Sequence, residues 1–133
     1  MAVQLSVTVR NARLDQIETT VGTAPLLRIY SGSVPANCAA SETGTVLAEI
    51  ALPSDWMSAA SAGSKAKLGT WTDASADNTG TATHFRVYDS AGTTCHVQGT
   101  AGTSGTDMIL DSTSFTAGQS FTVSSFTLTD GNA

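Results

Sequence analysis

Two histidines surrounded by hydroxyl and carboxylate side chains are the residues of this chain best suited to catalysis. They are His84 and His96, and the chain also has 16 serines and several aspartates. A serine, a histidine and an aspartate in hydrogen-bonding contact would form a hydrolytic triad. However, the sequence has no Gly-x-Ser-x-Gly motif, which places the nucleophile of many hydrolases at a strand-to-helix turn. We therefore expect both histidines on the solvent or interface side of a hairpin, and no catalytic residue.

The carboxylates form two groups whose chemistry would be metal binding or glycoside hydrolysis. Asp73, Asp77 and Asn78 lie in one turn-rich segment, and calcium prefers such loop oxygens, but their spacing is not that of an EF-hand. Asp107 and Asp111 flank a short apolar run and would suit acid/base work on a sugar only if they faced each other. Solvated turn residues explain both groups better, so we expect no metal and no cofactor.

Four aromatic residues could form a surface that stacks on sugars or binds a partner: Tyr30, Trp56, Trp71 and Tyr88. Aromatics make up only 6% of the chain, so the hydrophobic core requires some of them. Trp56 is followed by Met57, and both residue types are enriched at protein interfaces. The sequence does not decide whether Trp56 lies in the core or at an interface. We include Trp56 and Met57 among the candidate interface residues.

The two cysteines, Cys38 and Cys95, are far apart in sequence and fit no metal-ligand spacing. We expect two free thiols, as is usual for a protein made in a reducing cytoplasm. A disulfide is the alternative.

Composition indicates one soluble domain with a neutral surface. The chain has 133 residues, 13% of them charged, and 16 serines with 21 threonines. A single domain spanning residues 1–133 suits this length. The net charge of −5 and the six scattered basic residues disfavour nucleic-acid binding, which requires clustered Lys and Arg. No apolar run is long enough to cross a membrane, and the first residues do not resemble a signal peptide.

The N-terminal segment, residues 1–24, reads as an arm with both strand and helix character. Residues 3–9 alternate apolar and polar side chains, which predicts a strand. Residues 9–20 place Arg13, Ile17 and neighbouring apolar residues on one helical face, which predicts a short amphipathic helix that could begin as early as Gln4. Gly22 is placed to end this helix. Arg13 and Ile17 are therefore candidate interface residues.

Residues 25–133 predict an antiparallel β core. Within it, Leu47 should share a face with Glu49, and Cys95 should share a face with Val97. The final strand changes phase between Val123 and Phe126, which predicts a β-bulge at Ser124–Ser125. Seven or eight short strands with frequent turns are typical of a β-sandwich or jelly roll. The clearest predicted strands span residues 26–32, 45–52, 67–72, 83–90, 93–99, 107–111 and 120–129.

Several of these segments resemble a group of small virion proteins of tailed bacteriophages. The resemblance lies in R-I-Y-S-G-x-x-P, V-L-A, F-R-V-Y-D-x-x-G-T and the closing G-Q-S-F-T-V-S-S-F-T-L-T, and it covers most of residues 26–129. It implies a jelly-roll head decoration, or cement, protein. Such a protein would be made in the host bacterial cytoplasm and lie on the capsid surface of the virion.

The expected function is therefore structural and non-enzymatic. The partners implied are the major capsid protein and further copies of the chain, which would make the protein a homo-oligomer. We expect it to bind neither nucleic acid nor membrane. The contact elements should be the helix at 9–20 and the loops at 33–44 and 53–63, because they interrupt the sheet pattern. The alternatives are a phage tail, baseplate or fibre component, a carbohydrate-binding β-sandwich with Trp56 or Trp71 as its platform, and, least favoured, a hydrolase.

Overall fold

The computed structural model describes residues 3–131, and its first element is helix α1 (Val7–Val21). Ser6 caps the helix, because its hydroxyl oxygen accepts from the backbone N–H of Val9 at 3.2 Å. Gly22 ends it at a φ of +91°, donating to the carbonyl of Glu18. The predicted helix and its glycine end are confirmed. The strand predicted at 3–9 is wrong, since the Ser6 cap starts a helix in the middle of the alternating pattern.

Residues 3–131 also contain ten strands, which makes the chain mostly β, as predicted. The predictions at 26–32, 45–52, 83–90, 93–99, 107–111 and 120–129 are confirmed, whereas only Thr72 of 67–72 lies in a strand. The strands are β1 (Leu26–Tyr30), β2 (Val46–Ala51), β3 (Ser64–Ala66), β4 (Thr72–Asp73), β5 (Gly80–Thr81), β6 (His84–Tyr88), β7 (Cys95–Gly102), β8 (Met108–Leu110), β9 (Ser114–Phe115) and β10 (Phe121–Thr129).

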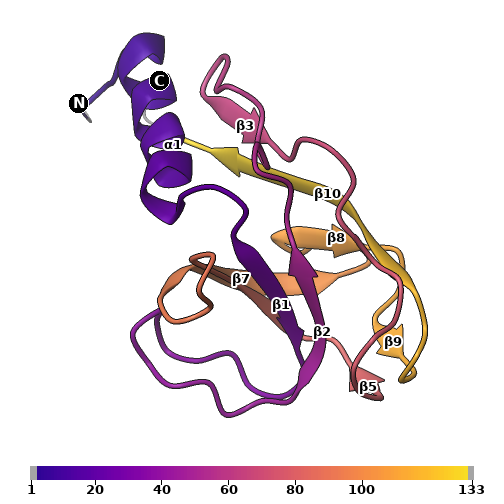
Figure 1. Cartoon of the computed structure of the whole chain (residues 1–133). Helices are drawn as coiled ribbons and strands as arrows, with labels where there is room; N and C mark the ends of the chain where they lie inside the picture. Colours follow the sequence, from indigo (N-terminus) through magenta and orange to yellow (C-terminus); the bar gives the residue numbers. More distant parts are fainter. Residues whose placement is uncertain (1–2, 132–133) are drawn as a thin grey trace.

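One curled sheet and a small second sheet form a β-sandwich or jelly-roll-like domain (Figure 1). The large sheet has the order β2-β1-β6-β7-β8-β10-β3, with β4 also paired to β10, and the small one pairs β5 with β9. Neighbouring strands are antiparallel, as predicted, except that β7 and β8 run parallel over a short stretch. Helix α1 lies beside β3, next to the end of β10 (Figure 1).

The core is one continuous cluster with a chain of aromatic rings through it. Trp56 and Trp71 lie 6.1 Å apart between ring centroids, Trp71 and Phe126 5.8 Å, and Phe85 and Phe126 5.4 Å. Each indole N–H donates to a backbone carbonyl at 3.1 Å, that of Trp56 to Gly22 and that of Trp71 to Leu68. Both tryptophans can therefore be buried without leaving a donor unpaired.

β-Bulges decide which side chains face this core. The bulge predicted in β10 is confirmed, because the pairing with β8 shifts between Val123 and Ser125 and so returns Phe126 to the core side. A second shift, opposite Ile29 and Tyr30, adds Leu47 to the buried side of β2. The expectation that Leu47 shares a face with Glu49 is therefore wrong.

A third shift affects β7, where Cys95 pairs with Tyr88 and Val97 pairs with Val87. Val97 packs against the core, whereas Cys95 lies opposite Tyr88 on the outer face of the sheet. The extra residue between them separates two side chains that strict alternation would place together. The prediction of a shared face for Cys95 and Val97 is wrong for this reason.

Candidate functional site

The outer face of strands β1, β6 and β7 carries a row of polar side chains under a long loop. We call residues 31–45, which connect β1 to β2, the covering loop. His84 and Arg86 project from β6 on this face and are only 0% and 3% exposed. The expectation that His84 lies on a solvent or interface side is therefore wrong, because the covering loop folds back over the sheet.

Thr83, His84 and Glu42 form a hydroxyl–imidazole–carboxylate chain. The Thr83 hydroxyl lies 2.8 Å from Nδ1 of His84, and Nε2 of His84 lies 2.9 Å from Oε2 of Glu42. This order of groups is the one that activates a nucleophile in hydrolases. The sequence did not single out Thr83 or Glu42, since they lie far from any hydrolase motif.

The contacts around the Thr83–His84–Glu42 series attach the covering loop to the sheet. The Thr83 hydroxyl also makes a 2.6 Å hydrogen bond to the carbonyl of Gly32, and the His84 ring stacks on Tyr30 with centroids 5.3 Å apart. Glu42 also accepts the backbone N–H of Gly44 at 2.8 Å. The loop is thus tied near both of its ends, at Gly32 through the Thr83 hydroxyl and at Glu42 through the buried imidazole.

Arg86 holds the middle of the covering loop. Its Nη2 donates to the carbonyls of Asn37 at 3.0 Å and Ala40 at 2.8 Å, and its Nε donates to Gln98 at 3.1 Å. Burial favours a lower pKa for Arg86, but hydrogen bonding to Tyr88 and the nearby Cys95, Tyr88 and Glu42 raise the pKa above its ordinary value. The guanidinium therefore stays charged under the loop.

Two tyrosines and an ion pair complete the polar face. The hydroxyls of Tyr30 and Tyr88 lie 3.0 Å apart, and burial, with the hydrogen bond to Tyr88, raises the pKa of Tyr30. Arg28 lies over the Tyr88 ring at 4.6 Å and pairs with Glu49 at 2.6 Å. Neither tyrosine is exposed enough to stack on a sugar, since they are 3% and 7% exposed.

A buried lysine anchors α1 to the sheet. The side chain of Lys65 is 1% exposed, and its Nζ pairs with Asp15 at 2.7 Å and Glu18 at 2.6 Å and donates to the carbonyl of Ser58 at 2.8 Å. Burial favours a lower pKa for Lys65, but these hydrogen bonds raise its pKa, and the bond from Lys65 lowers the pKa of Asp15. This anchor was not predicted, because an inward lysine breaks the apolar pattern that identifies a strand.

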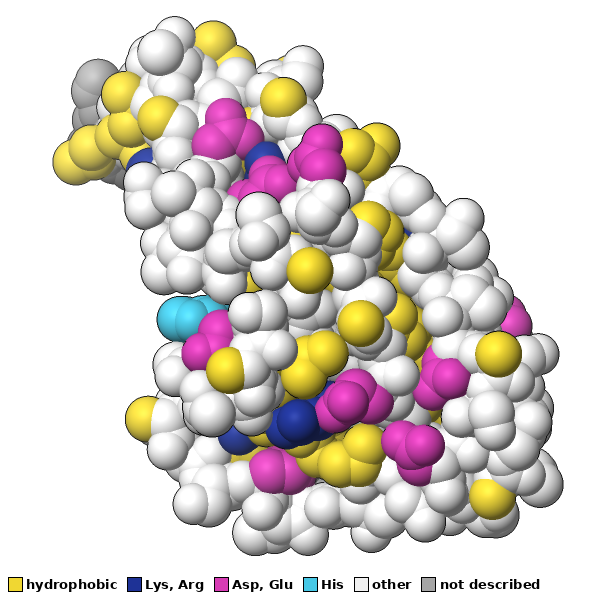
Figure 2. All heavy atoms as spheres, viewed as in Figure 1, with side chains coloured by type: hydrophobic (Ala, Val, Ile, Leu, Met, Phe, Trp, Pro, Cys, Tyr) yellow, Lys and Arg dark blue, Asp and Glu magenta, His cyan; other side chains and the backbone are white. Residues whose placement is uncertain are grey.

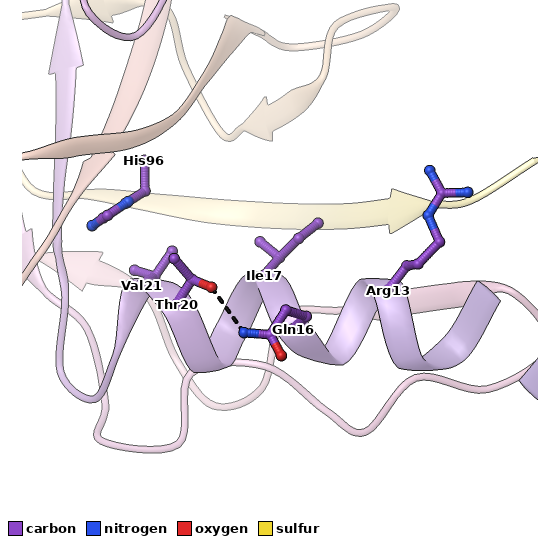
Figure 3. A pocket seen from close by; sticks show the side chains of 6 residues that line it. All are labelled: Arg13, Gln16, Ile17, Thr20, Val21 and His96. Atoms are coloured by element: carbon purple, nitrogen blue, oxygen red, sulfur yellow. Dashed lines mark hydrogen bonds between the residues drawn. The ribbon is translucent and has the colours of Figure 1, made fainter. Parts of the chain in front are cut away.

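The candidate interface residues Arg13 and Ile17 line a groove between α1 and β7. Its volume is about 210 Å³, and Figure 3 shows His96 facing the helix across it. Ile17 is half-buried against the edge of the core, and Arg13 pairs with Asp130 at 3.1 Å. The other lining residues are Gln16, Thr20 and Val21.

The N-terminal end of α1 exposes apolar side chains. Val3 is 78% exposed, Val7 45% and Val9 44%. Hydrophobic atoms are visible at this end of the molecule in Figure 2, while much of the remaining surface in that view is neutral. Three exposed valines thus surround the start of α1, and we call them the valine patch (Val3, Val7 and Val9).

Trp56 and Met57 do not lie on the surface. They are 0% and 1% exposed and belong to the core cluster, and Trp71 is also 0% exposed. The interface interpretation of Trp56 and Met57 is therefore wrong for the isolated chain, because the segment 53–63 turns both side chains inward. For the same reason neither tryptophan is available as a platform for carbohydrate.

The aspartates that suggested metal or sugar chemistry make local hydrogen bonds. Asp73 accepts from the backbone N–H of Ser75 at 2.9 Å, as in a turn. Asp107 accepts from both the N–H and the hydroxyl of Thr100, at 2.9 and 3.0 Å. Among residues 3–131, no group of three or more His, Cys, Asp or Glu side chains is arranged to hold a metal ion.

All six basic side chains have partners within the chain. Arg10 donates to the carbonyl of Asp130, Lys67 donates to that of Gly69, and the other four make the contacts described above. Phosphate binding would have to break these contacts. Over residues 3–131, α1 is too short and too polar to be a membrane-spanning helix.

Comparison of this chain with protein-family models, with curated proteins and with solved structures gives no match.

Proposed function

We propose that this chain is a non-enzymatic structural protein of a tailed-bacteriophage particle, a decoration protein that binds the outside of the head. In this role it bridges neighbouring major capsid protein subunits and stabilises the shell. The proposal joins the resemblance of residues 26–129 to phage virion proteins with the surface features described above. Self-association of the chain on the capsid belongs to the same proposal.

The valine patch is the observation that carries the proposal. Exposed apolar groups clustered at one site are characteristic of surfaces that bind another protein. The second half of the helix that presents them is anchored by Lys65, with Asp15 and Glu18 as its partners. A preformed helix loses little conformational entropy on binding, so more of the contact energy contributes to affinity.

The neutral exterior supports the same role. Only 13% of the residues are charged, and 37 residues are serine or threonine. Neutral polar faces can pack against neighbouring subunits without removing full charges from water. Many weak contacts of this kind, repeated over a symmetric shell, add up to strong attachment through multivalency.

The test uses purified capsids that lack the protein. We expect the isolated chain to rebind them and to raise the temperature at which they release their contents. The substitutions Val7→Asp and Val9→Glu place charge in the valine patch without weakening α1, because acidic residues favour the first turn of a helix and Glu three residues after Ser6 completes a capping box. This double variant should bind capsids at least about tenfold more weakly, since burying two valines contributes a few kcal/mol.

Leu68→Asp is the matched control. Leu68 is an apolar residue with a similar exposure of 41%, but it lies between β3 and β4, outside the segments predicted to make contacts. The control should rebind as the unaltered chain does. Normal rebinding by the Val7→Asp/Val9→Glu variant would contradict the assignment of the valine patch, and failure of the unaltered chain to bind any capsid would contradict the proposed function.

A further inference from the structure

The covering loop brings Cys38 over the β6–β7 hairpin, where Cys95 lies. Cys38 lies between Asn37 and Ala40, whose carbonyls both accept from Arg86 of β6. Gln98 of β7 donates to the carbonyl of Pro35 at 2.9 Å, so the loop is also tied to the second strand of the hairpin.

The β7 bulge places Cys95 on this same outer face. Cys95 pairs with Tyr88, and Gln98 pairs with Arg86, so both β7 residues project toward the covering loop. Cys38 is close enough to Cys95 to raise the pKa of the Cys95 thiol, and both residues are half-buried. The Cys95 thiol also lies 3.5 Å from the carbonyl of Val97. Hydrogen bonds from Arg86 and Gln98 to the covering loop thus hold two thiols, 57 residues apart in sequence, near each other.

We propose that Cys38 and Cys95 form a reversible intramolecular disulfide that fastens the covering loop to β7. The oxidant is a low-molecular-weight disulfide. One protein thiolate attacks it, forming a mixed disulfide and releasing a thiol; the second protein thiolate then attacks the mixed disulfide and releases a second thiol. The protein loses two electrons and two protons, and the oxidant gains them as its two thiols.

The surroundings determine how this pair reacts. Burial, and then the neighbouring Cys38, raise the pKa of Cys95 to about 11. Since the thiolate is the attacking species, Cys95 attacks slowly at neutral pH, and a reducing cytoplasm leaves both thiols free. The disulfide therefore forms after the chain meets an oxidising medium, outside the cell.

The disulfide closes a long loop of chain and so restricts the unfolded state. For a loop of this length in a domain of this size, the melting temperature should rise by roughly 5–15 °C. The covering loop should also become resistant to proteolysis, because its middle would be covalently attached to the sheet.

The experiment treats the purified full chain with oxidised glutathione in mildly alkaline buffer, under native conditions. We expect both thiols to disappear together, peptide mapping to show Cys38 linked to Cys95 in a monomer, and the melting temperature to rise as stated. Dithiothreitol should reverse all three changes. The matched controls Cys38→Ser and Cys95→Ser each keep one thiol and should show no rise in melting temperature on oxidation.

Three results would overturn the proposal: two titratable thiols remaining after oxidation, glutathione retained on either cysteine as the end product, or disulfide-linked dimers. If a serine variant does not fold, peptide mapping of the unaltered chain still decides between these results, because it needs no variant.

Discussion

Substitutions of Lys65 test how α1 is held on the sheet. The side chain is 1% exposed, while those of Asp15 and Glu18 are 49% and 23% exposed. Lys65→Ala removes the buried stem as well as the ammonium group. Each buried methylene contributes about 0.8 kcal/mol, and the ion pairs are lost as well, so the free energy of unfolding should fall by about 3 kcal/mol.

Lys65→Met keeps most of the buried stem and removes the charge. The two carboxylates left behind can be hydrated, because both are partly exposed, so the expected cost is only about 1 kcal/mol. For a chain of this size these costs correspond to falls in melting temperature of roughly 10 °C for alanine and 3 °C for methionine.

The assay is unfolding by urea and by heat at neutral pH, followed by circular dichroism. Lys67→Met is the matched control, since Lys67 lies two residues away on the chain, donates to the carbonyl of Gly69, lies over the Trp71 ring and, among residues 3–131, pairs with no carboxylate. It should change stability little. An equal and large loss for alanine and methionine at position 65 would refute this reasoning, because it would mean that the charge and not the buried stem holds the helix.

Three further predictions follow from single contacts. Folding lowers the pKa of Asp15, so this carboxylate stabilises the protein at pH values above its ordinary pKa of 3.8, and the stabilisation is lost as pH falls through the lower folded-state pKa. Folding raises the pKa of Lys65, so this ammonium group stabilises the protein at pH values below its ordinary pKa of 10.5, and the stabilisation is lost as pH rises through the higher folded-state pKa. Melting temperature should therefore fall at both extremes, and Asp15→Asn should flatten the acid side. Gly44→Ala should destabilise the chain by about 1–3 kcal/mol and expose the covering loop to protease, because a Cβ there would collide with the backbone carbonyl of Ser31; an unchanged protease pattern would contradict this. Deleting Ser124 removes the β10 bulge and leaves Val123 and Phe126 two residues apart, so strict alternation keeps both on the core side; the protein should still melt cooperatively, and failure to fold or binding of hydrophobic dyes would contradict the assigned register.

Much of the β core could be predicted because its pattern is local. The change of phase around Ser124 and Ser125 can be read from the spacing of Val123 and Phe126, and the structure contains the bulge that this spacing requires. The helix end at Gly22 was predictable for the same reason. The start at Ser6 was not, since alternating and helical patterns overlap in the preceding residues.

The polar face could not be predicted, because alternation along a strand does not show what covers it. His84 and Arg86 alternate with core residues and so read as exposed, but the covering loop, which starts at Ser31, supplies Glu42 and several carbonyls as partners. The inward direction of Lys65 depends on carboxylates fifty residues earlier in the chain. Trp56 was ambiguous because interfaces and cores use the same side chains.

Imaging of purified virus particles tests the proposed function most directly. A reconstruction at side-chain resolution should show this chain on the outside of the head, between neighbouring capsid subunits, with Val3, Val7 and Val9 covered by the contact. Density for the chain on the tail or baseplate, or particles that contain none of it, would contradict the proposal.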